Sequence, residues 1–181
     1  MSSDIFNGFL LAAQQETHNK YGGGGNSNDV TLEVYQLNWQ CVQLSPVDIA
    51  ENSEAVLRRF AKSIQLDDRL LPYFCLYLVR RVENDYQPVR MFQNFESPYL
   101  TLCSENQRNQ ATTFKYVILV RKSYWDTDYD DDLHQDKAAL NIIYWQALHE
   151  IEKSYVPASQ EIRNRLTSLQ ARGDKIEVGR K

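Results

Sequence analysis

Apolar and polar residues alternate with a period of two from residue 29 onward. Residues 29–37 place every second side chain on an apolar face, which is typical of a half-buried strand. A similar segment, 39–46, follows a turn near Asn38, and we expect the two to form a hairpin that ends at Pro46.

The period becomes helical in residues 52–66, where apolar residues recur at intervals of three and four. Asn52 or Ser53 is placed to cap the first turn, so we expect an amphipathic helix that packs on the hairpin. Its polar side carries three cations, Arg58, Arg59 and Lys62.

Three more strands are expected after this helix. Residues 72–82 are apolar on both faces, as in a central strand. After a turn at 83–86, residues 87–93 begin beside a proline, which is typical of an edge strand. An irregular connection, 96–110, leads to a last alternating strand at 113–125. The order strand, strand, helix, strand, strand, strand is that of a β-grasp, the ubiquitin-like fold, in which one helix lies across a mixed sheet.

The rest of the chain has helical periodicity. Residues 133–156 predict a long helix with an apolar stripe that includes Leu140 and Tyr144, and Pro157 ends this helix. Residues 158–175 predict a second helix with a narrower stripe. Two helices cannot bury both stripes by themselves, so they predict the start of an all-helical unit. The expected fold class is therefore α+β, a ubiquitin-like β-grasp followed by helices.

The first 28 residues predict a short helix and a tether. Residues 4–16 have apolar side chains at helical spacing, and 22–28 are glycine-rich with no side chains able to pack, so they predict a flexible linker. A phosphate-binding loop is the alternative, but it would need a preceding strand and a following Lys-Ser or Lys-Thr.

Charge and composition exclude several classes of protein. A net charge of −4 over 181 residues argues against nucleic acid as a partner, since such binding needs a basic surface. No apolar run reaches the roughly 20 residues of a membrane span, and the first residues lack the basic flank of a signal peptide, so a cytoplasmic location is expected. Three dispersed cysteines predict buried free thiols.

The stretch KSYWDTDYDDD, residues 122–132, is the strongest candidate for chemistry. A calcium loop starting at Asp126 would need a glycine at Asp131 and a glutamate at Lys137. An aspartyl phosphotransferase would need a parallel sheet and a lysine from another strand end. We therefore expect these carboxylates before and within the first turn of the long helix, where they favour its dipole; attraction of a basic partner remains open.

No other segment predicts catalysis. His149 and Glu150 begin a zinc-protease pattern, but Lys153 stands where the second histidine is required, and no serine or cysteine lies in a nucleophile-elbow sequence. The sequence predicts no catalytic residue, no cofactor and no metal site, and the protein is not expected to be an enzyme.

Three segments carry a family resemblance: FNGFLLAAQQET, LPYFCLYLVRR and RKSYWDTDYDDD. Together they resemble the PX-FERM sorting nexins. The resemblance implies the last helix of a PX domain at 1–21, a linker at 22–28, the first FERM lobe at 29–125 and the start of the helical second lobe at 126–181. The polar ending EVGRK suggests that the second lobe is truncated.

The resemblance implies part of a non-catalytic endosomal cargo adaptor that returns receptors to the plasma membrane. Its partners would be phosphatidylinositol 3-phosphate on early endosomes, bound by the PX domain, and receptor tails with Asn-Pro-x-Tyr motifs, bound by the third lobe. The residues for both lie outside this sequence. The alternative is a Ras-association-like module that binds an activated small GTPase. Its available cations would be Arg58, Arg59, Lys62, Arg80 and Arg81.

Overall fold

The computed structural model describes residues 29–83, 85–109 and 113–178. The helix expected at 4–16 and the linker expected at 22–28 lie outside the described residues. The described chain comprises two compact units, of which the first runs to Tyr144 and the second begins at Trp145.

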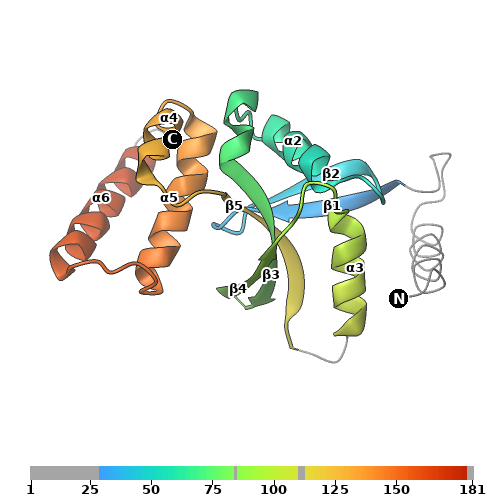
Figure 1. The fold of residues 1–181 in the computed structure, drawn as a ribbon. Helices are drawn as coiled ribbons and strands as arrows, with labels where there is room; N and C mark the ends of the chain where they lie inside the picture. The colour runs from blue at the N-terminus through green and yellow to red at the C-terminus, as the bar shows by residue number, and fades with distance from the viewer. Residues whose placement is uncertain (1–28, 84, 110–112, 179–181) are drawn as a thin grey trace. The chain divides into compact units, whose positions relative to one another are not determined.

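The first unit is built on a sheet of five strands in the order β2-β1-β5-β3-β4 (Figure 1). β1 and β5 are parallel, and the other neighbours are antiparallel. This mixed sheet confirms the predicted β-grasp, with β5 in the middle and β2 and β4 at the edges. The strands are β1 (Asp29–Tyr35), β2 (Cys41–Asp48), β3 (Phe74–Val82), β4 (Asp85–Met91) and β5 (Lys115–Lys122).

Helix α2 (Ser53–Ser63) supplies one side of the core, as its apolar stripe predicted. The Asn52 side chain accepts the Ala55 N–H at 2.9 Å and caps the first turn. Val56 and Phe60 are fully buried against the sheet, in the same cluster as Ile118 of β5. Burying each large apolar side chain stabilises the fold by about 1.5–3 kcal/mol, so packing of α2 on β5 contributes much of the stability of the first unit.

The first hairpin does not end at Pro46, because β2 continues to Asp48. The pairing of β1 with β2 shifts between Val30 and Leu32, so Ser45 and Pro46 lie in a bulge of an edge strand. A proline is tolerated there because a bulge in an edge strand does not need the ladder hydrogen bond that the missing N–H would donate.

The connection expected to be irregular contains a helix, α3 (Pro98–Arg108). The Ser97 hydroxyl accepts the Leu100 N–H at 3.2 Å, and Pro98 occupies the first turn, where its missing N–H costs nothing. On the next turns, the Asn106 amide accepts the Tyr116 N–H at 2.9 Å and donates to the Tyr116 carbonyl at 3.2 Å. One side chain thus satisfies both main-chain groups of Tyr116 on β5.

The aspartates lie before the long helix, as expected, but the expectation that some lie within its first turn is wrong. They lie in two short helical turns of their own, η2 (Thr127–Tyr129) and α4 (Asp130–Leu133). A further 3-10 helix, η1 (Asp68–Tyr73), precedes β3. The long helix, α5 (Lys137–Glu152), begins separately, and Asp136 accepts the Ala139 N–H at its start at 2.8 Å.

The buried side of α5 also differs from the expected stripe. Ala139 and Ile142 are buried in the core of the first unit, together with Leu133, whereas Leu140 and Tyr144 are 42% and 39% exposed. The second unit contains the end of α5 and helix α6 (Gln160–Val178). Within that unit, the Arg163 guanidinium donates to the Ile151 carbonyl at 3.0 Å and so joins α6 to the end of α5.

We expect Asn106→Ala to lower the free energy of unfolding by about 1–3 kcal/mol, because it leaves two main-chain groups of Tyr116 without partners. Alanine has the higher helix propensity, so a loss cannot come from α3 itself. Urea denaturation measures the change, and Gln107→Ala on the exposed side of the same helix is the control, expected within about 0.5 kcal/mol. Equal stabilities of the two variants would contradict this role of Asn106.

Candidate functional site

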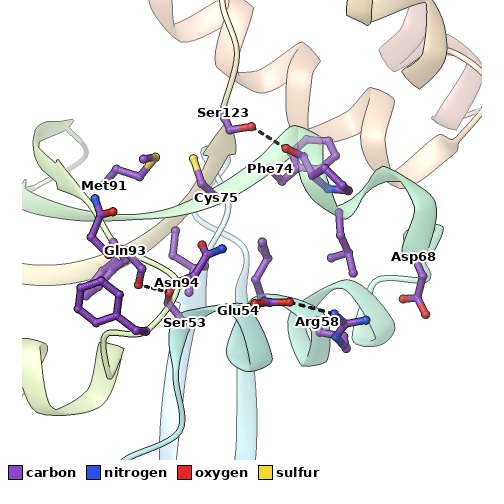
Figure 2. A pocket seen from close by; sticks show the side chains of 16 residues that line it. Ser53, Glu54, Arg58, Asp68, Phe74, Cys75, Met91, Gln93, Asn94 and Ser123 are labelled. Atoms are coloured by element: carbon purple, nitrogen blue, oxygen red, sulfur yellow. Dashed lines mark hydrogen bonds and ion pairs between the residues drawn. The ribbon is translucent and has the colours of Figure 1, made fainter.

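A groove opens in the first unit because β4 is shorter than β3. β4 pairs only with Tyr77–Val82, so the first three residues of β3, Phe74 to Leu76, lie beyond its end. The groove has a volume of about 650 Å³ and lies between the start of α2, η1, the start of β3 and the loop 92–97 (Figure 2). This volume lies within the range of ligand pockets, roughly 300–1,000 Å³.

The groove is apolar on its floor and along one lip. The apolar lining residues that also pack in the core form the floor of the groove, and most of their surface is buried. They are Leu57, Leu71, Phe74, Leu76 and Phe92. Along this lip, Met91 at the end of β4 and Phe95 in the loop 92–97 line the groove and are 41% and 81% exposed. A phenylalanine that exposed offers apolar area for contact with another molecule.

Hydrogen bonds fix the loop that forms this lip. The buried Ser53 hydroxyl donates to the Gln93 carbonyl at 2.6 Å, and the Ser53 N–H donates to the Glu96 carbonyl at 2.8 Å. The Glu96 carboxylate accepts from Arg90 at 2.7 Å and from the Gln93 N–H at 2.6 Å. The Arg90 hydrogen bond is the main reason that the pKa of Glu96 is lowered. The groove is therefore preformed rather than assembled by a ligand.

The other side of the groove is charged. Glu54 and Arg58 form an ion pair of 3.3 Å across one turn of α2, and the exposed Asp68 of η1 lines the groove beyond them (Figure 2). Cys75 also lines the groove, but burial raises the pKa of its thiol to about 12, so it stays protonated and is a poor nucleophile or metal ligand. The arrangement suits binding rather than catalysis.

The three predicted cations all lie on α2, but they point to different sides of the helix. Arg58 lines the groove. Arg59 instead donates to Glu51 at 2.9 Å and to the Pro46 carbonyl, which ties the helix to the edge strand β2. Lys62 is exposed in the last turn.

The two predicted cations on β3 stack on aromatic rings instead of extending freely into solvent. Arg80 lies over Phe114, 4.4 Å from the ring centroid, and Arg81 lies over Trp39 at 4.1 Å. As consecutive residues of a strand they face opposite sides of the sheet. The structure therefore does not gather the five cations into one patch.

The aspartate stretch works as a joint within the first unit. Tyr73 donates to Asp132 at 2.6 Å, Tyr124 donates to Asp130 at 2.5 Å, and Lys122 lies 3.8 Å from Asp130. Burial and the hydrogen bond to Asp130 raise the pKa of Tyr124, so the phenol stays a donor. Among the described residues, no three His, Cys, Asp or Glu side chains form a group that could hold a metal ion, and no helix is both long and apolar enough to cross a membrane.

Two family models match consecutive parts of the chain. The model of the sorting nexin 17/27/31 FERM domain, F1 lobe, matches residues 30–125, and that of the sorting nexin 17/31 FERM domain, F2 lobe, matches 126–179. Sorting nexin-17 of Danio rerio is 37% identical over 97% of this chain, and that of Homo sapiens is 38% identical over 97%. The chain spans 35% of the length of both relatives.

Solved structures support the fold at low sequence identity. The MyTH4-FERM MF1 domain of Dictyostelium discoideum myosin VII superimposes with a TM-score of 0.60 at 10% identity, covering 82% of this chain and 28% of that one. The MF2 domain gives a TM-score of 0.58 at 10% identity, with coverages of 79% and 27%. At this identity the likeness concerns the arrangement of helices and strands alone.

Acid should weaken the loop that carries Phe95. Because the pKa of Glu96 is lowered in the fold, its stabilising effect is present above its ordinary pKa of about 4.3 and is lost as pH falls through the folded value. We expect Glu96→Gln to be less stable than the wild type at pH 7 and equally stable well below the folded pKa, as measured by urea denaturation. Glu105→Gln, whose parent carboxylate meets Arg108 at 3.5 Å on α3, is the control and should show a smaller difference at pH 7. A Glu96→Gln difference that persists unchanged in acid would contradict this assignment.

Proposed function

Because the chain belongs to the sorting nexin 17/27/31 FERM family, we propose that it is a non-catalytic part of an endosomal cargo adaptor. The observation that carries the proposal is the match of two successive FERM lobes over 30–125 and 126–179. The groove offers apolar and charged surfaces for binding, whereas its one thiol, Cys75, stays protonated and is a poor nucleophile. Both features are consistent with a binding role in an adaptor.

The proposal assigns residues 1–21 to the end of a PX domain, 22–28 to a linker, 29–125 to the first FERM lobe and 126–181 to the start of the second. In the whole protein, the PX domain would bind phosphatidylinositol 3-phosphate on early endosomes. A third FERM lobe would bind Asn-Pro-x-Tyr motifs of receptor tails. This chain would then contribute the first lobe and its joint to the second.

A chimera tests the proposal. Residues 3–179 of this chain replace the equivalent segment of zebrafish sorting nexin-17, and the product is expressed in cells that lack their own sorting nexin-17. We expect the chimera to return a receptor with an Asn-Pro-x-Tyr tail to the cell surface, as measured by antibody uptake and recycling. The isolated 181-residue chain should not bind a fluorescein-labelled Asn-Pro-x-Tyr peptide.

The control chimera carries Leu133→Asp, which places a charge in the core of the first unit and should prevent that unit from folding. A chimera that reaches endosomes at normal abundance but fails to recycle the receptor would refute the adaptor role of this segment.

Two structural observations favour the small GTPase alternative. β2 is an edge strand, so a partner strand can pair with it, and Arg59 holds the cationic helix α2 beside it. Against it, β2 contains no Lys or Arg, and Arg59, Arg80 and Arg81 are engaged within the fold.

If this alternative holds, Ras-type GTPases loaded with a non-hydrolysable GTP analogue should bind and the GDP-loaded forms should not. Calorimetry measures both. Lys62→Glu should weaken the complex about fivefold or more by placing an acid against the acidic partner, whereas Arg108→Glu on α3 should leave it unchanged. Equal binding of both nucleotide states, or none, removes the alternative.

A further inference from the structure

We propose that the groove beside α2 binds a short linear segment of a partner protein in which a large apolar side chain lies near a lysine or arginine. This site goes beyond the proposed adaptor function, since that function places receptor tails and lipid elsewhere in the protein. It would give the first lobe a protein partner of its own.

The apolar end of the groove provides the anchor point. Phe95 is 81% exposed and Met91 is 41% exposed, although most of the area of the neighbouring Phe92 and Phe74 is already buried. The two lip residues stand where the sheet edge stops, above a floor of Leu57 and other core side chains. A Leu, Met or aromatic side chain seated between lip and floor would remove most of this exposed area from water.

The charged end of the groove selects a cation. Its ionisable lining residues are Glu54, Arg58 and Asp68, which together carry one net negative charge. Arg58 is paired with Glu54, and the neighbouring Asp67 is paired with Arg69 at 2.6 Å, so the exposed Asp68 is left as the carboxylate that a partner can neutralise. An incoming acid or phosphate would meet Asp68 and a guanidinium that is already engaged, so a basic residue fits better.

The apolar and the charged ends lie on opposite sides of the groove. Figure 2 shows Met91, Gln93 and Asn94 on one side of the groove and Asp68 with Arg58 on the other, with Glu54 and Cys75 between them. A short peptide can place one side chain at each of these two sides. Because hydrogen bonds of Ser53 and Glu96 already fix the loop 92–97, little ordering entropy is lost when the peptide binds.

Fluorescein-labelled nine-residue peptides test the site. Each contains one Phe or Leu and one Arg separated by one to three residues in a Gly-Ser background, and a matched set carries Glu in place of Arg. We expect saturable fluorescence polarisation with the Arg peptides at micromolar to low millimolar concentration and at least tenfold weaker binding of the Glu set. Amide shifts in the ¹⁵N-labelled chain should map to Leu57, Asp68, Met91 and Phe95.

Two variants and two controls make the test specific. Phe95→Ser should lower the affinity at least tenfold, and Asp68→Lys should reverse the preference from Arg to Glu peptides. Val89→Ser, which changes an exposed apolar residue of β4 outside the groove lining, and Glu83→Lys in the β3–β4 turn should leave both unchanged. All four positions are exposed, so dispersed amide spectra will show that each variant is folded.

Several outcomes would overturn the proposal. They are no saturable binding by any peptide, equal binding of the Arg and Glu sets, or shifts that map away from the groove. A second copy of the chain as the occupant would also overturn it, and sedimentation would show this as self-association that Phe95→Ser weakens. The recycling assay with the chimera reads a separate property, so failure of one test leaves the other interpretable.

Discussion

Burial of β5 on both of its faces is the constraint on which the first lobe depends. Ile118, Leu119 and Val120 are fully buried, because β5 lies between β1 and β3 in the middle of the sheet. Ile118 and Val120 contact the core beneath α2, whereas Leu119 faces the other side. That second face needs its own cover, and long polar side chains provide part of it.

Arginine and aromatic side chains form this cover. Arg121 lies over the rings of Tyr77 and Tyr86, and Arg81 lies over Tyr35 and Trp39, with ring-centroid distances of 4.1–5.8 Å. A guanidinium can stack on a ring while its hydrocarbon stem packs on the sheet, so these residues shield apolar area without losing their charge. This explains why a cation in β3 does not indicate a binding surface.

The sequence predicted the features that local periodicity determines and missed those that depend on distant contacts. The strands and α2 follow from periods of two and 3.6, because each buries one face or both in a single core. Helix α3 was missed because it depends on Asn106, whose partner Tyr116 lies on β5. Its cap at Ser97 is local and could have been recognised from the sequence. The buried side of α5 was misplaced because Leu133 and Asp136, not the richest apolar stripe, fix how the helix enters the core.

The candidate site shows the same division. Arg58 could be identified from sequence as an exposed cation of α2, but its groove could not. The groove lies where the β3–β4 register leaves Phe74 to Leu76 paired with β5 on one side but not with β4 on the other. A lip residue such as Phe95 looks like any other apolar side chain in a loop until its exposure is known.

The geometry of α2 also separates two possible modes of recognition. Successive residues of a helix point about 100° apart, so Arg58 lines the groove while its neighbour Arg59 contacts Pro46 on β2. A peptide in the groove and a strand added at β2 would therefore use different sides of the same helix. If both proposals hold, neither mode would need α2 to move, so one lobe could bind both partners at once. Competition would then arise only from steric overlap of the partners themselves.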